Sequence, residues 1–354
     1  RAQFFDHAPL DLAEADLELG LLSKQMRART FQFSILYTLC AVFVLLTSNM
    51  LAGDFFGHYQ KVSYFKTIFR GEKVDLKLDA LDTLSNAWGP DLIDQTPIIL
   101  SVYKTEKDPL LHDKTFDALS AIAYTVRAAS NPRSHLSAAK APLWKHKVSA
   151  LLRDGMLSDL KETLASSTDT ASRTRAWMIL ATVSPESILA EAKKTPEDKT
   201  LLEKEDRVSL VLALSWLNGE DAVEALRAEL ADNRHPQTRI TALWALGNFL
   251  RTYEAPKKND GQPEEYVQIT INRIKSFIDS EHLDTRCAAL VSLGKAGDMR
   301  LLETYVRAIQ TSTPEQQCVT QEIHIPNRRP ELMYKAGSLQ FRALEALAYI
   351  ARGN

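Results

Sequence analysis

Apolar side chains recur along residues 74–354 with the spacing of one face of an α-helix. Counted from a starting polar or basic residue, position +3 is small or apolar, +4 large and apolar, +7 apolar and +8 small. Positions +3, +4 and +7 lie on one face of a helix, so each occurrence predicts an amphipathic helix. The pattern starts at Lys77, Thr115, Arg173, Arg207, Arg239, Arg286 and Gln340.

A second amphipathic segment precedes most of these helices, most clearly over residues 148–164, 222–230 and 267–278. Turn residues separate the two members, as in the stretch Asn-Arg-His-Pro at 233–236. Each unit is therefore a helical hairpin of about 35 to 50 residues, which cannot bury its apolar face alone. Stacking buries that face against neighbours, so residues 74–354 predict an α-solenoid of about seven hairpins.

Two of the units carry a resemblance to a known family. Residues 235–249, HPQTRITALWALGNF, and 282–298, HLDTRCAALVSLGKAGD, resemble the second helix of HEAT repeats of the short bacterial type, which are related to the repeats of phycobilin lyases. That motif places an arginine after an acid or turn residue and before a helix rich in alanine and leucine that ends in glycine. The match is moderate at Arg173 and Gln340 and degenerate in the other three units. The resemblance implies a HEAT-like solenoid and, for activity, a scaffold role.

The arginine recurs as Arg173, Arg239 and Arg286. The resemblance implies that it ties adjacent repeats together through an acidic partner. An anion-binding site is the alternative that the repetition leaves open.

An uncharged stretch near the start predicts a single transmembrane helix over residues 31–53. Its first 22 residues, FQFSILYTLCAVFVLLTSNMLA, carry no charge and suffice to cross about 30 Å of hydrocarbon. Residues 1–30 then form a juxtamembrane segment, and 54–73 form a connector rich in interfacial aromatics. A buried core helix or a cleaved signal peptide are the alternatives for this stretch.

The charges around residues 31–53 suggest an orientation. Lys24, Arg27 and Arg29 precede it closely, which favours a cytoplasmic N-terminus under the positive-inside rule. We therefore expect a single-pass protein of a bacterial inner membrane with a periplasmic solenoid; a cytoplasmic solenoid is the alternative. The sequence begins at Arg1 without methionine, so we also expect that residues precede it.

Composition supports a helical chain and narrows its function. Glycine is sparse, at 13 residues, and few stretches alternate with period two, which together predict an all-α fold. The net charge of -2 lacks the basic excess typical of nucleic-acid binding. The cysteines, Cys40, Cys287 and Cys318, are too few for a disulfide framework and form no CxxC pair.

No motif for chemistry is present. The sequence has no GxGxxG, Walker loop, GxSxG or HExxH, and its 8 histidines are scattered rather than clustered at metal-ligand spacing. We therefore predict no catalytic, cofactor-binding or metal-binding residues, and a protein that is not an enzyme.

Insertions that break the repeat are the candidate contact sites, because such segments lie on one face of a solenoid. The best is residues 312–337, which mixes apolar anchors with paired arginines, residue types found at binding hot spots. A cap packed over the last hairpin is the equal alternative. Residues 130–147 form another insertion. The predicted partner-binding residues are Ile323, His324, Arg328, Arg329, Met333 and Tyr334, with Trp144.

These observations favour a membrane-anchored HEAT-repeat scaffold or assembly subunit. It would mediate protein–protein interactions within a multi-subunit membrane complex, with other protein subunits and the lipid bilayer as its partners. A lyase or chaperone for cofactor attachment and a ligand-sensing membrane protein are the alternatives.

Overall fold

The computed structural model of this chain describes residues 63–85, 93–129, 141–194, 201–217, 219–252, 265–297, 299–325 and 330–353. The chain divides into two compact units, Arg1–Tyr64 and Phe65–Asn354. Nearly all of the first unit lies outside the described residues, so the fold below is that of the second.

Helices dominate the second unit. Residues 63–70 are helical, and the helices that follow are α2 (Val74–Ser85), α4 (Thr96–Thr105), α5 (Pro109–Ala129), α6 (Ala141–Ser166), α7 (Thr170–Val183), α8 (Pro185–Ala192), α9 (Leu201–Leu214), α10 (Glu220–Ala228), α11 (Pro236–Thr252), α12 (Glu265–Lys275), α13 (Leu283–Ala296), α14 (Leu302–Thr311) and α15 (Leu339–Gly353). A short 3₁₀ turn, Met299–Leu301, precedes α14.

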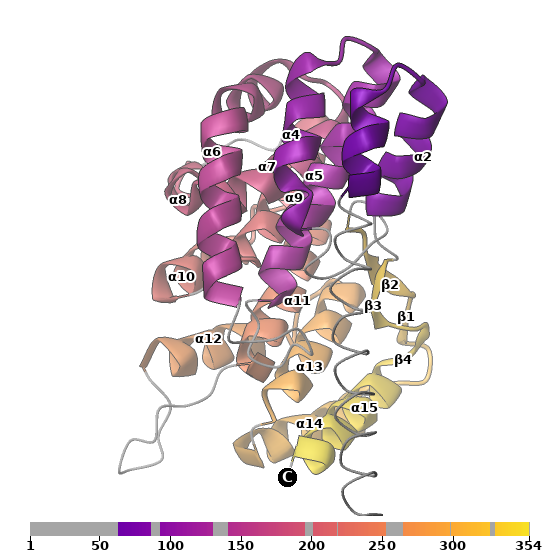
Figure 1. Ribbon diagram of the computed structural model, residues 1–354. Coiled ribbons are helices and arrows are strands. Elements are labelled where there is room, and N and C mark those ends of the chain that lie inside the picture. The colour runs from indigo at the N-terminus through magenta and orange to yellow at the C-terminus, as the bar shows by residue number, and fades with distance from the viewer. Residues whose placement is uncertain are drawn as a thin grey trace, which may run out of the picture. The chain divides into compact units, whose positions relative to one another are not determined.

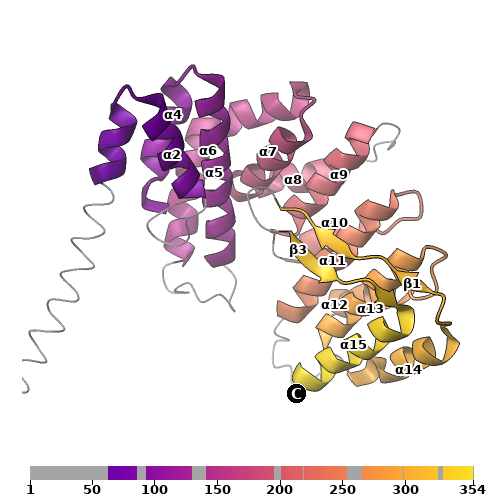
Figure 2. The same cartoon turned by 90° about the vertical axis from the view of Figure 1, so that its right-hand side faces the viewer.

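The helices pair into hairpins that stack in chain order. One row runs α2, α5, α7, α9, α11, α13 and α15, each packed on the next (Figures 1 and 2). Their partners α4, α6, α8, α10, α12 and α14 each pack on the row helix that follows them. All seven pattern starts lie in helices of this row, so the predicted helices are confirmed. Their expected one-sided burial is not general, because α7, α11 and α13 are buried on most sides.

Glycines at position +8 let neighbouring helices of the row approach closely. A Cβ atom built on Gly247 of α11 would come within 2.8 Å of the Cα atom of Ser292 in α13. One built on Gly294 of α13 would come within 2.7 Å of the Cα atom of Ala346 in α15. The +8 position of each helix therefore faces position +6 of the next.

We expect Gly294→Ala to destabilise the C-terminal hairpins. Alanine is favoured over glycine in a helix by about 1 kcal/mol, but the new methyl meets backbone, and overpacking costs about 1–3 kcal/mol. The net loss follows from the urea midpoint. Alanine at Gly219 is the comparison: its Cβ would meet nothing, so any loss there comes from the positive φ of 101° and not from a clash. A midpoint raised by G294A would contradict the close packing.

The segment between α14 and α15 corrects the all-α prediction. Strand β1 (Gln317–Cys318) pairs antiparallel with β4 (Gly337–Ser338), and β2 (Gln321–Ile323) pairs with β3 (Glu331–Tyr334). Buried Ile323 and Ile325 alternate with exposed Glu322 and His324, which is the period of a strand. The alternation is too short to stand out in the sequence. Residues 317–338 are called the β-ribbon below.

The predicted transmembrane helix and the single-pass localisation that depended on it are also corrected. No helix within the described part of the chain is both long and apolar enough to cross a membrane. The longest, α6 with 26 residues and α5 with 21, are interrupted by charged side chains. Residues 1–30 and 31–53 lie outside the described residues, and 54–73 is described only from residue 63.

Candidate partner-binding surface

The structure buries the apolar members of the predicted binding set. Ile323, Met333 and Tyr334 lie in the β-ribbon and belong to the hydrophobic core, whereas His324 is exposed. Their burial fits the alternative of a cap over the last hairpin. Arg328 and Arg329 lie outside the described residues, as does the side chain of Trp144, which stands in α6. Their role in partner binding stays a prediction.

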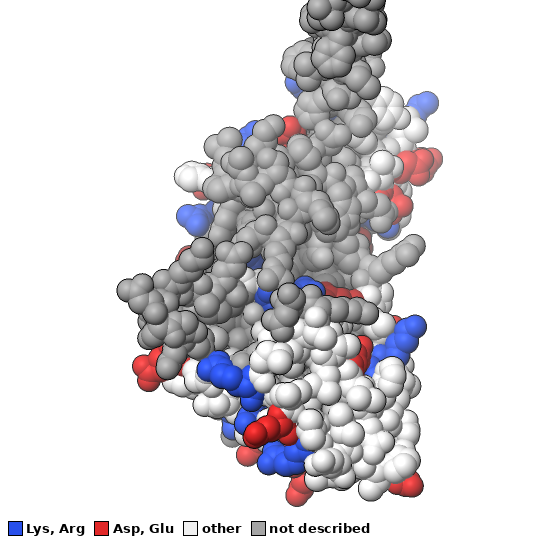
Figure 3. Space-filling view, turned by 90° about the horizontal axis from the view of Figure 1, so that it is seen from below, with Lys and Arg blue, Asp and Glu red and all other residues white. Residues whose placement is uncertain are grey.

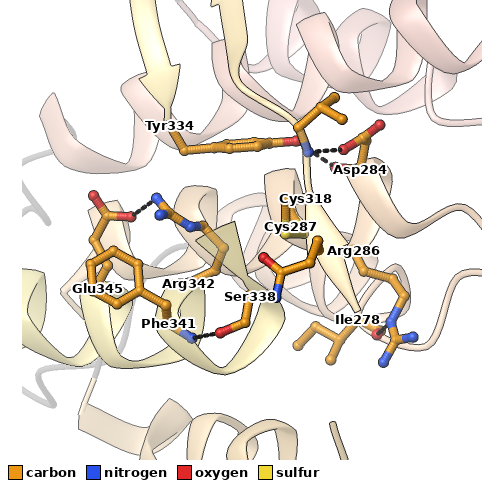
Figure 4. Close-up of a disulfide and its surroundings, with 12 residues drawn as sticks. Ile278, Asp284, Arg286, Cys287, Cys318, Tyr334, Ser338, Phe341, Arg342 and Glu345 are labelled. Atoms are coloured by element: carbon orange, nitrogen blue, oxygen red, sulfur yellow. Dashed lines mark hydrogen bonds and ion pairs between the residues drawn. A yellow bond between two sulfur atoms is a disulfide. The ribbon is translucent and has the colours of Figure 1, made fainter. Parts of the chain in front are cut away.

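A disulfide and two hydrogen bonds fix the β-ribbon to α13. Cys318 of β1 is bonded to Cys287 of α13, with their Cα atoms 6.4 Å apart (Figure 4). The hydroxyl of Tyr334 donates to the Asp284 carbonyl at 3.1 Å, and Val319 N donates to the Asp284 carboxylate at 3.1 Å. Burial raises the pKa of the Tyr334 hydroxyl. The two cysteines have a sequence separation of 31, and only the fold brings them together.

The β-ribbon also packs against α15 through an arginine. Arg342 is almost fully buried and forms an ion pair with Glu345. Its guanidinium lies 4.7 Å from the ring centre of Phe341 and 5.7 Å from that of Tyr334. Glu345 and Phe341 belong to α15 itself, so the contact with Tyr334 is the one of the three that joins the helix to the ribbon (Figure 4). Another face of α15 is exposed.

That open face is apolar. Position +4 is buried in the six preceding row helices, as Leu81, Leu119, Trp177, Val211, Leu243 and Leu290. The equivalent residue of α15, Leu344, is 53% exposed, and Phe341 at +1 is 55% exposed. Phe341 aligns with Cys287, which is fully buried in α13. The last helix of the row therefore exposes the side chains that its predecessors bury.

The packing of the row identifies what this face receives. Position +8 faces the next helix in α11 and in α13, and in α15 it is the exposed Ala348. Phe341, Leu344 and Ala348 thus form the face on which another helix would stack. We call this the end face.

The neighbouring helix α14 also exposes apolar side chains, beside the charged Glu303 and Arg307. Leu302 and Val306 of α14, which packs on α15, are 43% and 40% exposed. Viewed from below, the described surface has a broad area with few charged residues next to a group of charged ones (Figure 3). Large exposed apolar patches mark interaction sites on folded proteins.

The arginines at the starts of the row helices differ in their partners. Arg173 pairs with Asp206 of the next hairpin at 2.8 Å, as the resemblance implied, and Trp177 donates to the same carboxylate. Arg207 pairs with the buried Glu229. Among the described residues Arg286 meets no acidic partner, and it donates instead to the Ile278 carbonyl at 3.0 Å (Figure 4). Of the three arginines for which an acidic tie was predicted, Arg173 confirms it, whereas Arg239 and Arg286 have no acidic partner among the described residues.

The described residues offer little for metal chemistry, since no group of three or more His, Cys, Asp or Glu side chains comes together among them. Sequence comparisons give no relative: no family model and no curated protein matches the chain. The HEAT resemblance accordingly stays a prediction.

One solved structure, the crystal structure of an engineered protein, is 14% identical over 82% of this chain and 78% of its own, with a TM-score of 0.33. A likeness at that level carries no statement about fold or function.

Proposed function

We propose that this chain is a helical-repeat scaffold that binds a partner protein through the end face of α15. The observation that carries the proposal is Leu344, exposed where six equivalent residues are buried. Apolar surface of this kind is stabilised when it is removed from water, by roughly 25 cal/mol for each Å². The end face presents the positions through which each earlier row helix packs on the next one.

The chemistry of the end face favours a helical partner. Within the chain, α13 covers α11 and α15 covers α13, each with a small residue at +6, which is Ser292 in α13 and Ala346 in α15. A partner would present an amphipathic helix whose apolar stripe is interrupted by one small residue opposite Ala348. Helices of this type bind in apolar grooves through side chains at i, i+3, i+4 and i+7.

A photo-crosslinking residue at position 344 tests the proposal in the cell of origin. Position 110, whose leucine is 55% exposed on α5, is the matched control. We expect position 344 to crosslink one protein, at residues spaced three or four apart along a helix, and Phe341→Asp to abolish the product.

Identical products from positions 344 and 110 would contradict a specific site. Crosslinks between two copies of this chain would replace the partner with a second copy.

A further inference from the structure

A cavity of about 550 Å³ lies between two consecutive hairpins, at the edge of the row where the hairpin turns gather. Its lining comes from Asp232 after α10, Arg239 of α11, Arg273 of α12 and the turn at residues 276–282 between α12 and α13. We call it the arginine cavity.

Arg239 is an unusual group for such a lining. Its residue is only 6% exposed, and its buried Nε atom has no hydrogen-bond partner. Across the residues that the structure describes, no carboxylate or carbonyl pairs with this guanidinium. A buried cationic group without a partner is costly, so a cavity lined by Arg239 favours an anionic ligand.

The other hairpins show what the position normally receives. The starting residue of a row helix usually donates to a carbonyl at the end of the helix before it. Arg173 donates to Leu164, Arg207 to Ala192, Arg286 to Ile278 and Gln340 to Ser312. For Arg239 the corresponding carbonyl is that of Leu230, and Arg273 occupies it at 2.8 Å.

Arg239 also lacks a carboxylate partner of the kind that Arg173 has. Arg173 pairs with Asp206, the residue just before the starting arginine of the next row helix. In the next row helix after Arg239, that place is held by Thr285, which is fully buried and whose hydroxyl has no partner. Asp206 is the one acid at this place in the seven described row helices, so Arg239 lacks the carboxylate partner that Arg173 has.

We propose that the arginine cavity is a binding site for a carboxylate ligand, which takes the place that Asp206 fills beside Arg173. The planar guanidinium matches a carboxylate with two parallel hydrogen bonds. Exposed Asp232, Asp279 and Glu281 stand at the rim. Against Arg239 and Arg273 these three acids leave the lining with one net negative charge, counting His282 as neutral. That net charge disfavours a dianion such as phosphate more than a monoanion. The proposal does not depend on the end face.

A carboxylate supplied by the protein itself should compete with the ligand for Arg239. Thr285→Asp places a carboxylate just before Arg286, as Asp206 stands just before Arg207. An acid in the first turn of α13 also suits the helix dipole. We expect it to fold and to lose ligand binding, whereas Arg239→Gln loses binding by removing the guanidinium.

The test is a titration with sodium acetate at constant ionic strength. It is followed by the Nε–Hε NMR signal of Arg239 in arginine-labelled protein and by saturation transfer to the acetate methyl group. We expect a saturable shift at Arg239, no shift at Arg173, and at least a tenfold loss of saturation transfer in both T285D and R239Q. Inorganic phosphate should bind more weakly than acetate.

Two peptides identify the source of the carboxylate. One is an acetylated glycine tetramer with a free C-terminus, and the other is an amidated Gly-Asp-Gly with only the side-chain carboxylate. Tighter binding of either than of acetate supports the site and assigns its ligand. Three results would overturn the site. They are a linear Arg239 shift that chloride reproduces, tighter binding of phosphate than of acetate, and unchanged saturation transfer to acetate in folded R239Q.

Discussion

Leu290→Asp is expected to unfold the C-terminal hairpins, while Leu344→Asp leaves stability almost unchanged. Both leucines stand at position +4 of a row helix, and the substitution is chemically identical. Leu290 is fully buried between α11 and α15, so its replacement leaves a carboxylate without a partner in the core. We expect a loss of more than about 4 kcal/mol there.

Leu344 is 53% exposed, so a carboxylate at that position stays in water. Substitutions at such surface positions usually change stability by no more than about 0.5 kcal/mol. Urea denaturation followed by far-UV circular dichroism measures both variants against the parent. Equal midpoints for the two aspartates would mean that the end face is covered in solution, and would remove the basis of the proposed function.

The row helices could be predicted from sequence because their signal is local. Each carries its own spacing of apolar positions, and the helix at Arg239 shows it as clearly as the helix at Arg286. The same locality explains why the end face was not predicted. Leu344 has the sequence surroundings of Leu290, and only the absence of a following helix among the described residues exposes it.

The remaining features depend on residues distant in sequence. The disulfide of Cys287 and Cys318 joins a helix to a strand, and the sequence around either cysteine does not predict this pairing. The β-ribbon alternates over too few residues to outweigh the helical pattern around it. For Arg239 a signal was available: the row helix after Arg239 has Thr285 at the place where the row helix after Arg173 has Asp206. It becomes informative only once the ion pair of Arg173 is known.

Glu229→Gln is expected to destabilise the middle of the row through a buried ion-pair network. Glu229 is fully buried, and both of its oxygens are engaged by Arg207, one at 2.8 Å. Arg234 lies 3.3 Å from the same carboxylate and is itself buried. One negative charge therefore stabilises two guanidinium groups away from water.

Glutamine keeps the shape of the side chain and removes that charge. Breaking a buried pair by neutralising one partner costs about 3–5 kcal/mol, because the cations remain buried without compensation. Glu191→Gln is the matched control, since Glu191 pairs with Lys194 at the surface, where such pairs contribute about 0–1 kcal/mol.

The loss should be local, because each hairpin of the row packs mainly on its neighbours. Hydrogen exchange of the α9, α10 and α11 amides should accelerate in Glu229→Gln before that of α2 or α15. Exchange as slow as in Glu191→Gln would mean that the network is open to water in solution. Uniform acceleration along the whole row would instead mean that the hairpins unfold as one cooperative unit, with Arg207, Glu229 and Arg234 at its centre.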